Sequence, residues 1–213
     1  MSVKILIAIV TCHKFRHRAD AQRGTWCQQV LGADVRFFLG AGGLSERPDE
    51  VLIDVSDAYL EFPQKCRATF QWALDHGYDY ILKCDDDVYI QPIRLLQSDF
   101  AHDYVGSTSG GSSRSPKEPY ASGFAHWLSR KSMEILVKSK IDDWAEDRWT
   151  GNVLNAANIR LRQDDRYVVI NAVNKQNLPL TGKDGPLRSN NHIAVCELEP
   201  PMMEQIHRQW MDS

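Results

Sequence analysis

Short apolar segments alternate with helical patterns from residue 4 to residue 90, and this alternation is the strongest constraint on the fold. Four apolar runs are typical of buried strands: Lys4–Thr11, Val35–Leu39, Val51–Val55 and Tyr78–Leu82. Two segments place apolar residues at helical spacing, and Gly77 follows the second as a helix stop: Arg18–Val30 and Gln64–His76. The order strand, helix, strand, strand, helix, strand predicts an α/β fold with a mostly parallel central sheet and helices on both faces.

The rest of the chain continues with less regular patterns. Further strands are expected at Phe124–Leu128, Tyr167–Ile170 and Ile193–Cys196. Further helices are expected from an N-cap at Ser129 to about Lys140, and over Glu146–Ile159. Two polar stretches predict loops: Ser107–Ser115 and Thr181–Asn191. Because no internal repeat or change of composition divides the chain, we expect a single domain over residues 1–213.

Composition narrows the class of protein. The 213 residues are 43% hydrophobic and carry a net charge of −3, which fits a globular chain and argues against a nucleic-acid partner. No apolar run approaches the ~18 residues of a membrane span. The five cysteines are scattered without a Cys-x-x-Cys pair, which argues against a structural zinc site and favours a reducing compartment. We therefore expect a cytoplasmic location.

Three consecutive carboxylates, Asp85, Asp86 and Asp87, lie between apolar segments. Like charges in such a run repel one another unless a cation neutralises them, and Mn²⁺ or Mg²⁺ prefers oxygen ligands. The alternative is an acidic turn exposed to solvent. In parallel sheets ligands bind at the carboxyl ends of the strands, where both this run and Thr11 are expected. The sequence therefore predicts a crevice with a divalent metal site.

Several segments resemble motifs of the β1,3-galactosyltransferase and Fringe-like enzymes, which have the GT-A fold. The acidic run is similar to their Asp-x-Asp motif. The other matching segments occur in the family's order: Arg18, Arg23-x-Thr25-Trp26, Asp57-x-Tyr59, Lys65, Trp72, Lys83, Tyr120-x-Ser122-Gly123, and Glu146-Asp147 with Gly151. Length and N-terminus also resemble a chlorovirus-type capsid-glycan glycosyltransferase domain. The resemblance implies a nucleotide-binding part at about 1–90 and an acceptor-binding part at about 91–213.

The resemblance also implies a metal set. Asp85 and Asp87 would bind Mn²⁺ or Mg²⁺, and Asp86 would face the ribose or the sugar. A late histidine would complete the set. His192, which begins an apolar strand, is chosen over His207, although a surface histidine is the alternative.

Five further residues are candidates for donor binding under this resemblance. Thr11 would border the nucleotide base, Arg18 would bind phosphate, and Lys65 would pair with an aspartate of the acidic turn. Lys183 and Arg188 lie in a polar loop that could close over the donor. For Lys65, Lys183 and Arg188 a solvated surface charge is the alternative, and for Arg18 the alternative is a simple pairing with acidic residues.

The acceptor side centres on Asp147, which would take a proton from the acceptor hydroxyl in an inverting enzyme. Its place near a helix start also suits helix stabilisation. Arg148-Trp149-Thr150 departs from the family's segment, which leaves the stereochemistry open. Ser122 and Gly123 are expected on this side. Of Trp144 and Trp149, one is expected to form an acceptor wall, and Trp149 is chosen.

Taken together, these residues predict a metal-dependent glycosyltransferase that moves a sugar from a UDP-hexose or UDP-deoxyhexose to a glycan or glycoprotein hydroxyl. If the protein is viral, it would act in the host cytoplasm. One alternative is a nucleotidyltransferase that makes a nucleotide sugar, but the segment after the first strand has no glycine-rich phosphate loop. The other is a non-catalytic sugar- or calcium-binding module.

Overall fold

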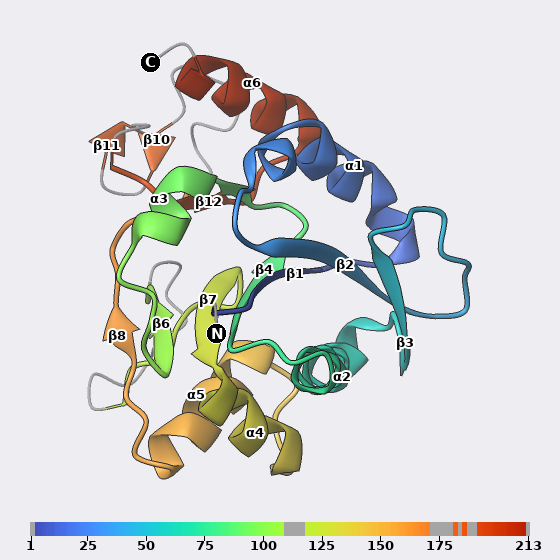
Figure 1. Ribbon diagram of the computed structural model, residues 1–213, viewed down its shortest axis with the longest axis vertical. Helices are drawn as coiled ribbons and strands as arrows, with labels where there is room; N and C mark the ends of the chain where they lie inside the picture. The colour runs from blue at the N-terminus through green and yellow to red at the C-terminus, as the bar shows by residue number, and fades with distance from the viewer. Residues whose placement is uncertain (1–2, 109–117, 171–180, 183–184, 187–190, 212–213) are drawn as a thin grey trace.

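The computed structural model describes residues 3–108, 118–170, 181–182, 185–186 and 191–211. Within these ranges the core of the molecule is a seven-stranded sheet of order β3-β2-β1-β4-β7-β6-β8 (Figure 1). Its strands are β1 (Ile5–Val10), β2 (Asp34–Ala41), β3 (Glu50–Ser56), β4 (Tyr80–Asp85), β6 (Tyr104–Gly106), β7 (Ala125–Ser129) and β8 (Arg162–Gln163). β3, β2, β1 and β4 are parallel, and β7 runs antiparallel to β4 and to β6. The expected α/β fold with a mostly parallel sheet is confirmed.

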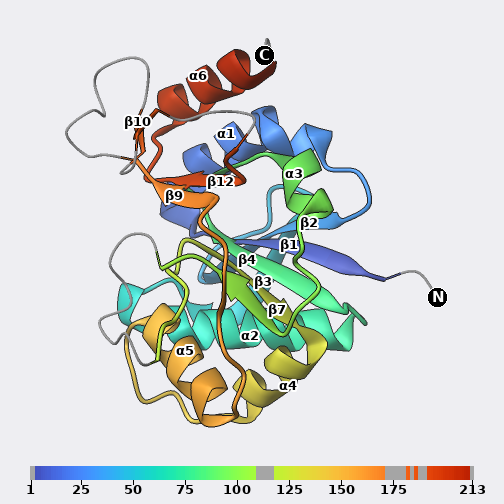
Figure 2. The same cartoon turned by 90° about the vertical axis from the view of Figure 1, so that its left-hand side faces the viewer.

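Helices cover both faces of this sheet (Figures 1 and 2). On one face lie α1 (Arg16–Gly24), α3 (Pro92–Gln97) and α6 (Pro200–Met211). On the other face lie α2 (Phe62–Asp75), α4 (Arg130–Lys138) and α5 (Glu146–Ala156). Three 3₁₀ turns complete the described helical structure: η1 (His13–Phe15), η2 (Trp26–Gln29) and η3 (Tyr59–Glu61).

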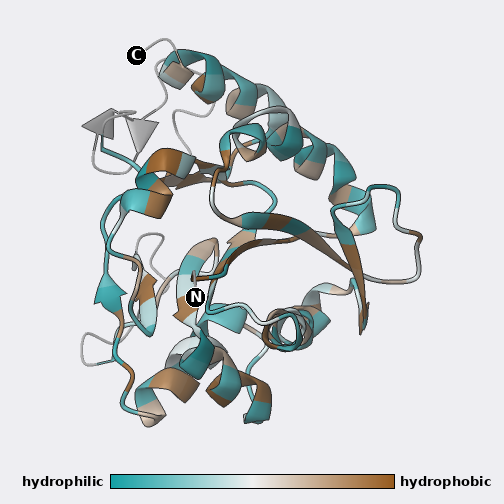
Figure 3. Ribbon diagram, viewed as in Figure 1, coloured by the Kyte–Doolittle hydropathy of each residue, from teal (hydrophilic) through white to brown (hydrophobic). Residues whose placement is uncertain are grey.

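Strand β1 shows why the sheet is central. Its residues are apolar without interruption, because side chains on both faces are buried. Ile7 and Ile9 pack into the core under α1 and α6, whereas Leu6 and Ala8 pack into the core over α2 and α4. The hydropathy colouring shows the same arrangement, with apolar strands between helices whose outer faces are polar (Figure 3).

A smaller three-stranded sheet lies beside the end of β4. It consists of β5 (Tyr89–Ile90), β12 (Ala194–Cys196) and β9 (Tyr167–Val169). The last two were expected as strands, although not as a separate sheet. Part of the predicted loop Thr181–Asn191 forms a two-stranded pair, β10 (Thr181–Gly182) with β11 (Gly185–Pro186). Most of the other predicted loop, Ser107–Ser115, lies outside the described residues.

The helix expected at Arg18–Val30 is shorter than predicted. It ends at Gly24, because Thr25 leaves the helical conformation with φ −120° and ψ −110°. The indole of Trp26 then donates a hydrogen bond to the carbonyl of Val88 at 3.1 Å, so a tertiary contact ends the helix.

Two other helix boundaries agree with the sequence. The predicted N-cap is confirmed, since the Ser129 hydroxyl accepts a hydrogen bond from the Ser132 amide at 3.3 Å. Gly77 follows α2 with a φ of +78°, a conformation that favours glycine. Among the described helices, none is long and apolar enough to cross a membrane.

Candidate active site

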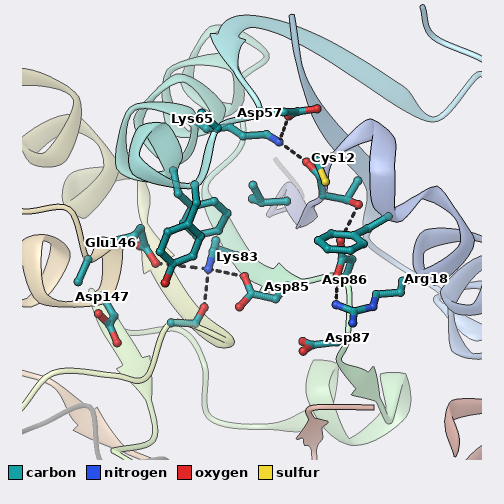
Figure 4. A pocket seen from close by; sticks show the side chains of 18 of the residues that line it. Cys12, Arg18, Asp57, Lys65, Lys83, Asp85, Asp86, Asp87, Glu146 and Asp147 are labelled. Atoms are coloured by element: carbon teal, nitrogen blue, oxygen red, sulfur yellow. Dashed lines mark hydrogen bonds and ion pairs between the residues drawn. The ribbon is translucent and has the colours of Figure 1, made fainter. Parts of the chain in front are cut away.

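A cavity of about 520 Å³ opens at the carboxyl ends of β1 and β4 (Figure 4). Segments from both halves of the chain line it. They are Val10–Cys12, Phe15, Arg18, Asp57–Tyr59, Phe62, Lys65, Lys83, Asp85–Asp87, Gly123 and Trp144–Asp147. The acidic run and the Thr11 segment therefore share one crevice, as the topology predicts for a parallel sheet.

Hydrogen bonds to its backbone hold the acidic turn from three sides. The Asp85 amide donates to the Phe124 carbonyl at 2.9 Å, and the Leu198 amide donates to the Asp87 carbonyl at 3.0 Å. The buried side-chain amide of Gln22 on α1 donates to the Asp85 carbonyl at 3.0 Å. Sequence reasoning missed Gln22, because nothing in its local pattern distinguishes a buried glutamine from a surface one.

The side chain of Asp86 faces the first strand and α1. It accepts a hydrogen bond from the Thr11 hydroxyl at 2.7 Å and lies 3.6 Å from the Arg18 guanidinium, which also contacts Glu199. Burial raises the pKa of Asp86, although Thr11 and Arg18 oppose the rise. Three of the predicted donor residues, Thr11, Arg18 and Asp86, thus lie in direct contact.

Asp87 is a half-buried carboxylate with excess negative charge around it. Burial, and then the neighbouring Asp85 and Asp86, raise the pKa of Asp87 to about 7. A cation bound here would relieve this repulsion. Two carboxylates on one turn fit a hard divalent ion that takes its remaining ligands from water and substrate phosphates. Asp85 and Asp87 therefore remain the predicted metal ligands.

The structure places His192 away from these carboxylates. It precedes β12 at the end where Ala194 pairs with Ile90, whereas Asp87 lies beside Leu198 beyond the other end of β12. His192 is not among the described residues that line the cavity. Nor does the described part of the chain bring three His, Cys, Asp or Glu side chains together in a metal-binding arrangement. The assignment of His192 as a ligand stays a prediction.

A buried cation connects the acidic turn to helix α5. The Lys83 ammonium is fully buried, donates to Asp85 at 2.7 Å and to the Gly123 carbonyl, and lies 3.3 Å from Glu146 (Figure 4). Burial would lower its pKa, but the carboxylates of Asp85 and Glu146 raise the pKa of Lys83 well above its ordinary value. Lys83 is therefore charged, and it fixes two sides of the cavity relative to each other.

Two of the motif segments also meet through a glycine. A Cβ atom on Gly151 would lie 2.1 Å from the Cβ of Tyr120, so only glycine lets α5 approach this segment so closely. With the Lys83 contacts to Gly123 and Glu146, three segments far apart in the sequence converge at one place.

Asp147 lines the cavity from the first turn of α5. Its carboxylate accepts a hydrogen bond from the Arg148 amide at 2.8 Å, which also suits stabilisation of the helix start. The side chain is half-buried and so is open to a ligand. Its role as a base stays a prediction.

Lys65 differs from expectation. It pairs with Asp57 and with the Thr11 carbonyl rather than with an aspartate of the acidic turn. The reason is that Asp57 lies nearer, at the end of β3, where it also accepts from the amides of Gly40 at 2.7 Å and His13 at 3.1 Å. Lys65 therefore ties the loops after β1 and β3 together.

The expected acceptor wall at Trp149 is wrong. The Trp149 side chain is fully buried in the core, and its indole donates to the Lys140 carbonyl at 3.1 Å. Trp144 lines the cavity instead and is 54% exposed. Gly123 also lines the cavity, while Ser122 is buried beside it. Lys183 and Arg188 lie outside the described residues.

Comparison with known proteins agrees with the motifs. Residues 17–112 match the family model described as Galactosyltransferase. The chain resembles the galactosyltransferases. Probable beta-1,3-galactosyltransferase 12 of Arabidopsis thaliana is 30% identical over a region that covers 44% of this chain and 33% of the relative. The chain thus spans about a third of the length of this relative. The resemblance to β1,3-galactosyltransferases is confirmed.

Two solved structures share the fold of this chain. One is a glycosyltransferase involved in glycosylation of the major capsid of PBCV-1, with a TM-score of 0.59, 11% identity, and coverage of 97% of this chain and 99% of the other. The second, from Desulfovibrio desulfuricans G20, is assigned as a nucleotide-diphospho-sugar transferase. Its TM-score is 0.52, with 13% identity, and the match covers 76% of this chain and 80% of the other. At these identities the likeness shows the fold, and the expected GT-A type is confirmed.

Proposed function

We propose that this chain is a metal-dependent glycosyltransferase that moves a sugar from a nucleotide sugar, UDP-linked, to a hydroxyl of a glycan or glycoprotein. The observation that carries the proposal is that the acidic turn and Asp147 open onto one cavity. A donor diphosphate at the turn would thus leave its sugar facing a carboxylate. The galactosyltransferase match of residues 17–112 supports the same reaction class.

Asp85 and Asp87 would hold Mn²⁺ or Mg²⁺. Such an ion, when bound, neutralises charge on the departing diphosphate. Arg18, paired with Asp86 and Glu199 at the same wall, adds a fixed positive charge near the diphosphate. Thr11 and Lys65 shape the floor of the donor side through their contacts with Asp86 and Asp57.

Asp147 would accept the proton of the acceptor hydroxyl as that oxygen attacks the anomeric carbon, and the bond from the sugar to the diphosphate breaks. Glu146, the neighbouring carboxylate, also lines the cavity, but it is only 4% exposed and contacts Lys83 and Thr150, whereas Asp147 is half-buried. This difference between adjacent carboxylates favours Asp147 as the general base.

The test measures nucleoside diphosphate release from a panel of nucleotide sugars, with Mn²⁺ or with EDTA. We expect release from a UDP-sugar with Mn²⁺ and none with EDTA. Pyrophosphate exchange in place of release would favour a nucleotidyltransferase. If no nucleotide sugar binds or turns over with any divalent ion, the proposal is wrong.

Variants then separate binding from chemistry. Asp87→Asn should abolish Mn²⁺-dependent UDP binding. Asp147→Asn should keep UDP binding but lower transfer about 10²–10⁴-fold, the usual contribution of a general base. Asp142→Asn is the matched control, since Asp142 is exposed in the segment before α5 and does not line the cavity. Full activity of Asp147→Asn would remove this residue from the mechanism.

A further inference from the structure

Two exposed aromatic side chains meet at one wall of the cavity, although they come from different parts of the chain. Tyr59, in η3, is 73% exposed, and Trp144, before α5, is 54% exposed. Their ring centroids lie 6.1 Å apart with an interplanar angle of 46°. Both residues line the cavity. Large exposed aromatic surfaces rimmed by polar groups are typical of ligand-binding sites.

The position of this aromatic pair relates it to the acceptor side. Trp144 directly precedes the cavity-lining stretch Ala145–Asp147, and Asp147 is the proposed base. The acidic turn that would take the diphosphate is lined on its far side by Arg18 and Phe15. Because the Tyr59 ring contacts Trp144, a ligand lying over both rings would lie beside the segment that carries the base.

The geometry of the pair favours a pyranose over a flat nucleobase. Rings whose centroids are 6.1 Å apart leave no slot between them, since a sandwiched ring needs about 3.5–4 Å on each side. The pair instead presents one continuous, bent apolar surface. Ala58 and Phe62 also line the cavity and have no side-chain hydrogen-bonding group for a base edge, and the polar Asp57 and Lys65 beside them are paired with each other. The C–H face of a sugar ring matches such a surface.

Neighbouring contacts keep Trp144 in place. Asp143, directly before it, accepts a hydrogen bond from Arg148 at 2.7 Å, and the Arg148 guanidinium lies 6.0 Å from the Trp144 ring. The ion pair closes the segment onto the first turn of α5. A rigid aromatic surface loses little conformational entropy when a ligand binds, which favours recognition.

We infer that Tyr59 and Trp144 form the acceptor subsite and bind a pyranose ring of the acceptor by stacking. The identification of the bound sugar as the acceptor rests on the proposed function. The binding itself can be measured without any transfer reaction. The pair would determine which acceptors are used, while donor binding would depend on the Thr11, Arg18 and Asp86 contacts.

The first experiment measures binding alone. Saturation-transfer NMR is recorded on methyl β-galactoside, methyl N-acetyl-β-glucosaminide and methyl α-rhamnoside, with UDP and Mn²⁺ present. We expect at least one glycoside to bind the wild-type protein through its ring C–H protons, and Tyr59→Ala and Trp144→Ala to abolish this signal. Trp144→Phe should retain it. The matched control is Leu60→Ala, because Leu60 is 67% exposed next to Tyr59 but does not line the cavity.

The second experiment uses turnover. Both alanine variants should raise the acceptor KM about tenfold or more, as expected when one apolar contact face is lost, with UDP affinity and hydrolysis of the donor by water changed less than about twofold. Three results would overturn the inference: no glycoside bound by the wild type, binding by the alanine variants equal to that of Leu60→Ala, or an equal loss of UDP affinity. The last result would assign the pair to the nucleobase. Loss of donor turnover in the wild type with glycoside binding intact would instead overturn the proposed function.

Discussion

The cavity contains two buried lysines that differ in how their charge is balanced. Lys65, on α2, contacts one carboxylate, Asp57, whose side chain is 20% exposed. Lys83, on β4, contacts two carboxylates, and one of them, Glu146, has a side chain only 2% exposed. Asp57 also accepts hydrogen bonds from the amides of Gly40 and His13, whereas Glu146 accepts one from the hydroxyl of Thr150.

This difference determines how much stability the protein loses when each lysine is removed. Without Lys65, Asp57 still has two amide donors and contact with water. Without Lys83, Glu146 would be a buried carboxylate with no cation beside it, and this would strongly lower the stability of the fold. The same ion-pair chemistry therefore carries different weight, because the exposure of the partner decides what remains when the cation is removed.

The largest expected effect is that of Lys83→Met. Because it leaves a buried carboxylate without its cation, we expect the free energy of unfolding to fall by about 3–5 kcal/mol. Urea denaturation followed by circular dichroism measures it. Adding Glu146→Gln should restore part of the loss, since the buried charge is then gone. A double variant no more stable than Lys83→Met would contradict the account based on charge.

Lys65→Met should have a smaller effect of about 1.5–3 kcal/mol, the usual contribution of a hydrogen bond to a charged group. The same denaturation experiment applies. Lys131→Met is the surface control: Lys131 pairs with Asp103 at 2.8 Å, but its side chain is 64% exposed, so we expect less than about 1 kcal/mol. A loss from Lys65→Met as large as that from Lys83→Met would end the distinction between the two lysines.

The smallest expected effect is a pH dependence. Burial alone would raise the pKa of Asp57. The hydrogen bonds from Lys65 and from the His13 amide outweigh burial and hold this pKa below its ordinary value. The ionised Asp57 therefore adds stability. This stability is fully present above the pKa of Asp57 in the unfolded state, about 3.9, and is lost as the pH falls through its lower pKa in the folded state. The stability difference between wild type and Lys65→Met should shrink between pH 7 and pH 3. A constant difference would show that Lys65 acts through packing alone.

The sequence predicts the strands well where burial on both faces makes them continuously apolar, as in β1. The contact of Thr11, Arg18 and Asp86 also follows from topology, because the carboxyl ends of parallel strands meet at one edge. The role of Lys83 could not be predicted, since its partner Glu146 lies far along the chain. A lysine in a strand signals nothing until the neighbouring element is known.

Two other differences have separate causes. Trp144 and Trp149 cannot be ranked from composition, because the start of α5 at Glu146 decides which indole faces the core. Helix α6 was missed although its signal is present. Met203, Ile206 and Trp210 are buried at helical spacing after Pro200, which suits the first turn of a helix.

The acidic turn joins the beginning, middle and end of the described chain. Asp86 contacts Thr11, the Asp85 amide donates to the Phe124 carbonyl, and the Asp87 carbonyl accepts from the Leu198 amide. When synthesis has reached Asp147, the acidic turn and the proposed base are both present. The turn still lacks its backbone partner Leu198. Contacts between residues so distant in sequence are slow to form. The complete geometry of the turn therefore becomes available only after the segment around Leu198 has been made and has docked.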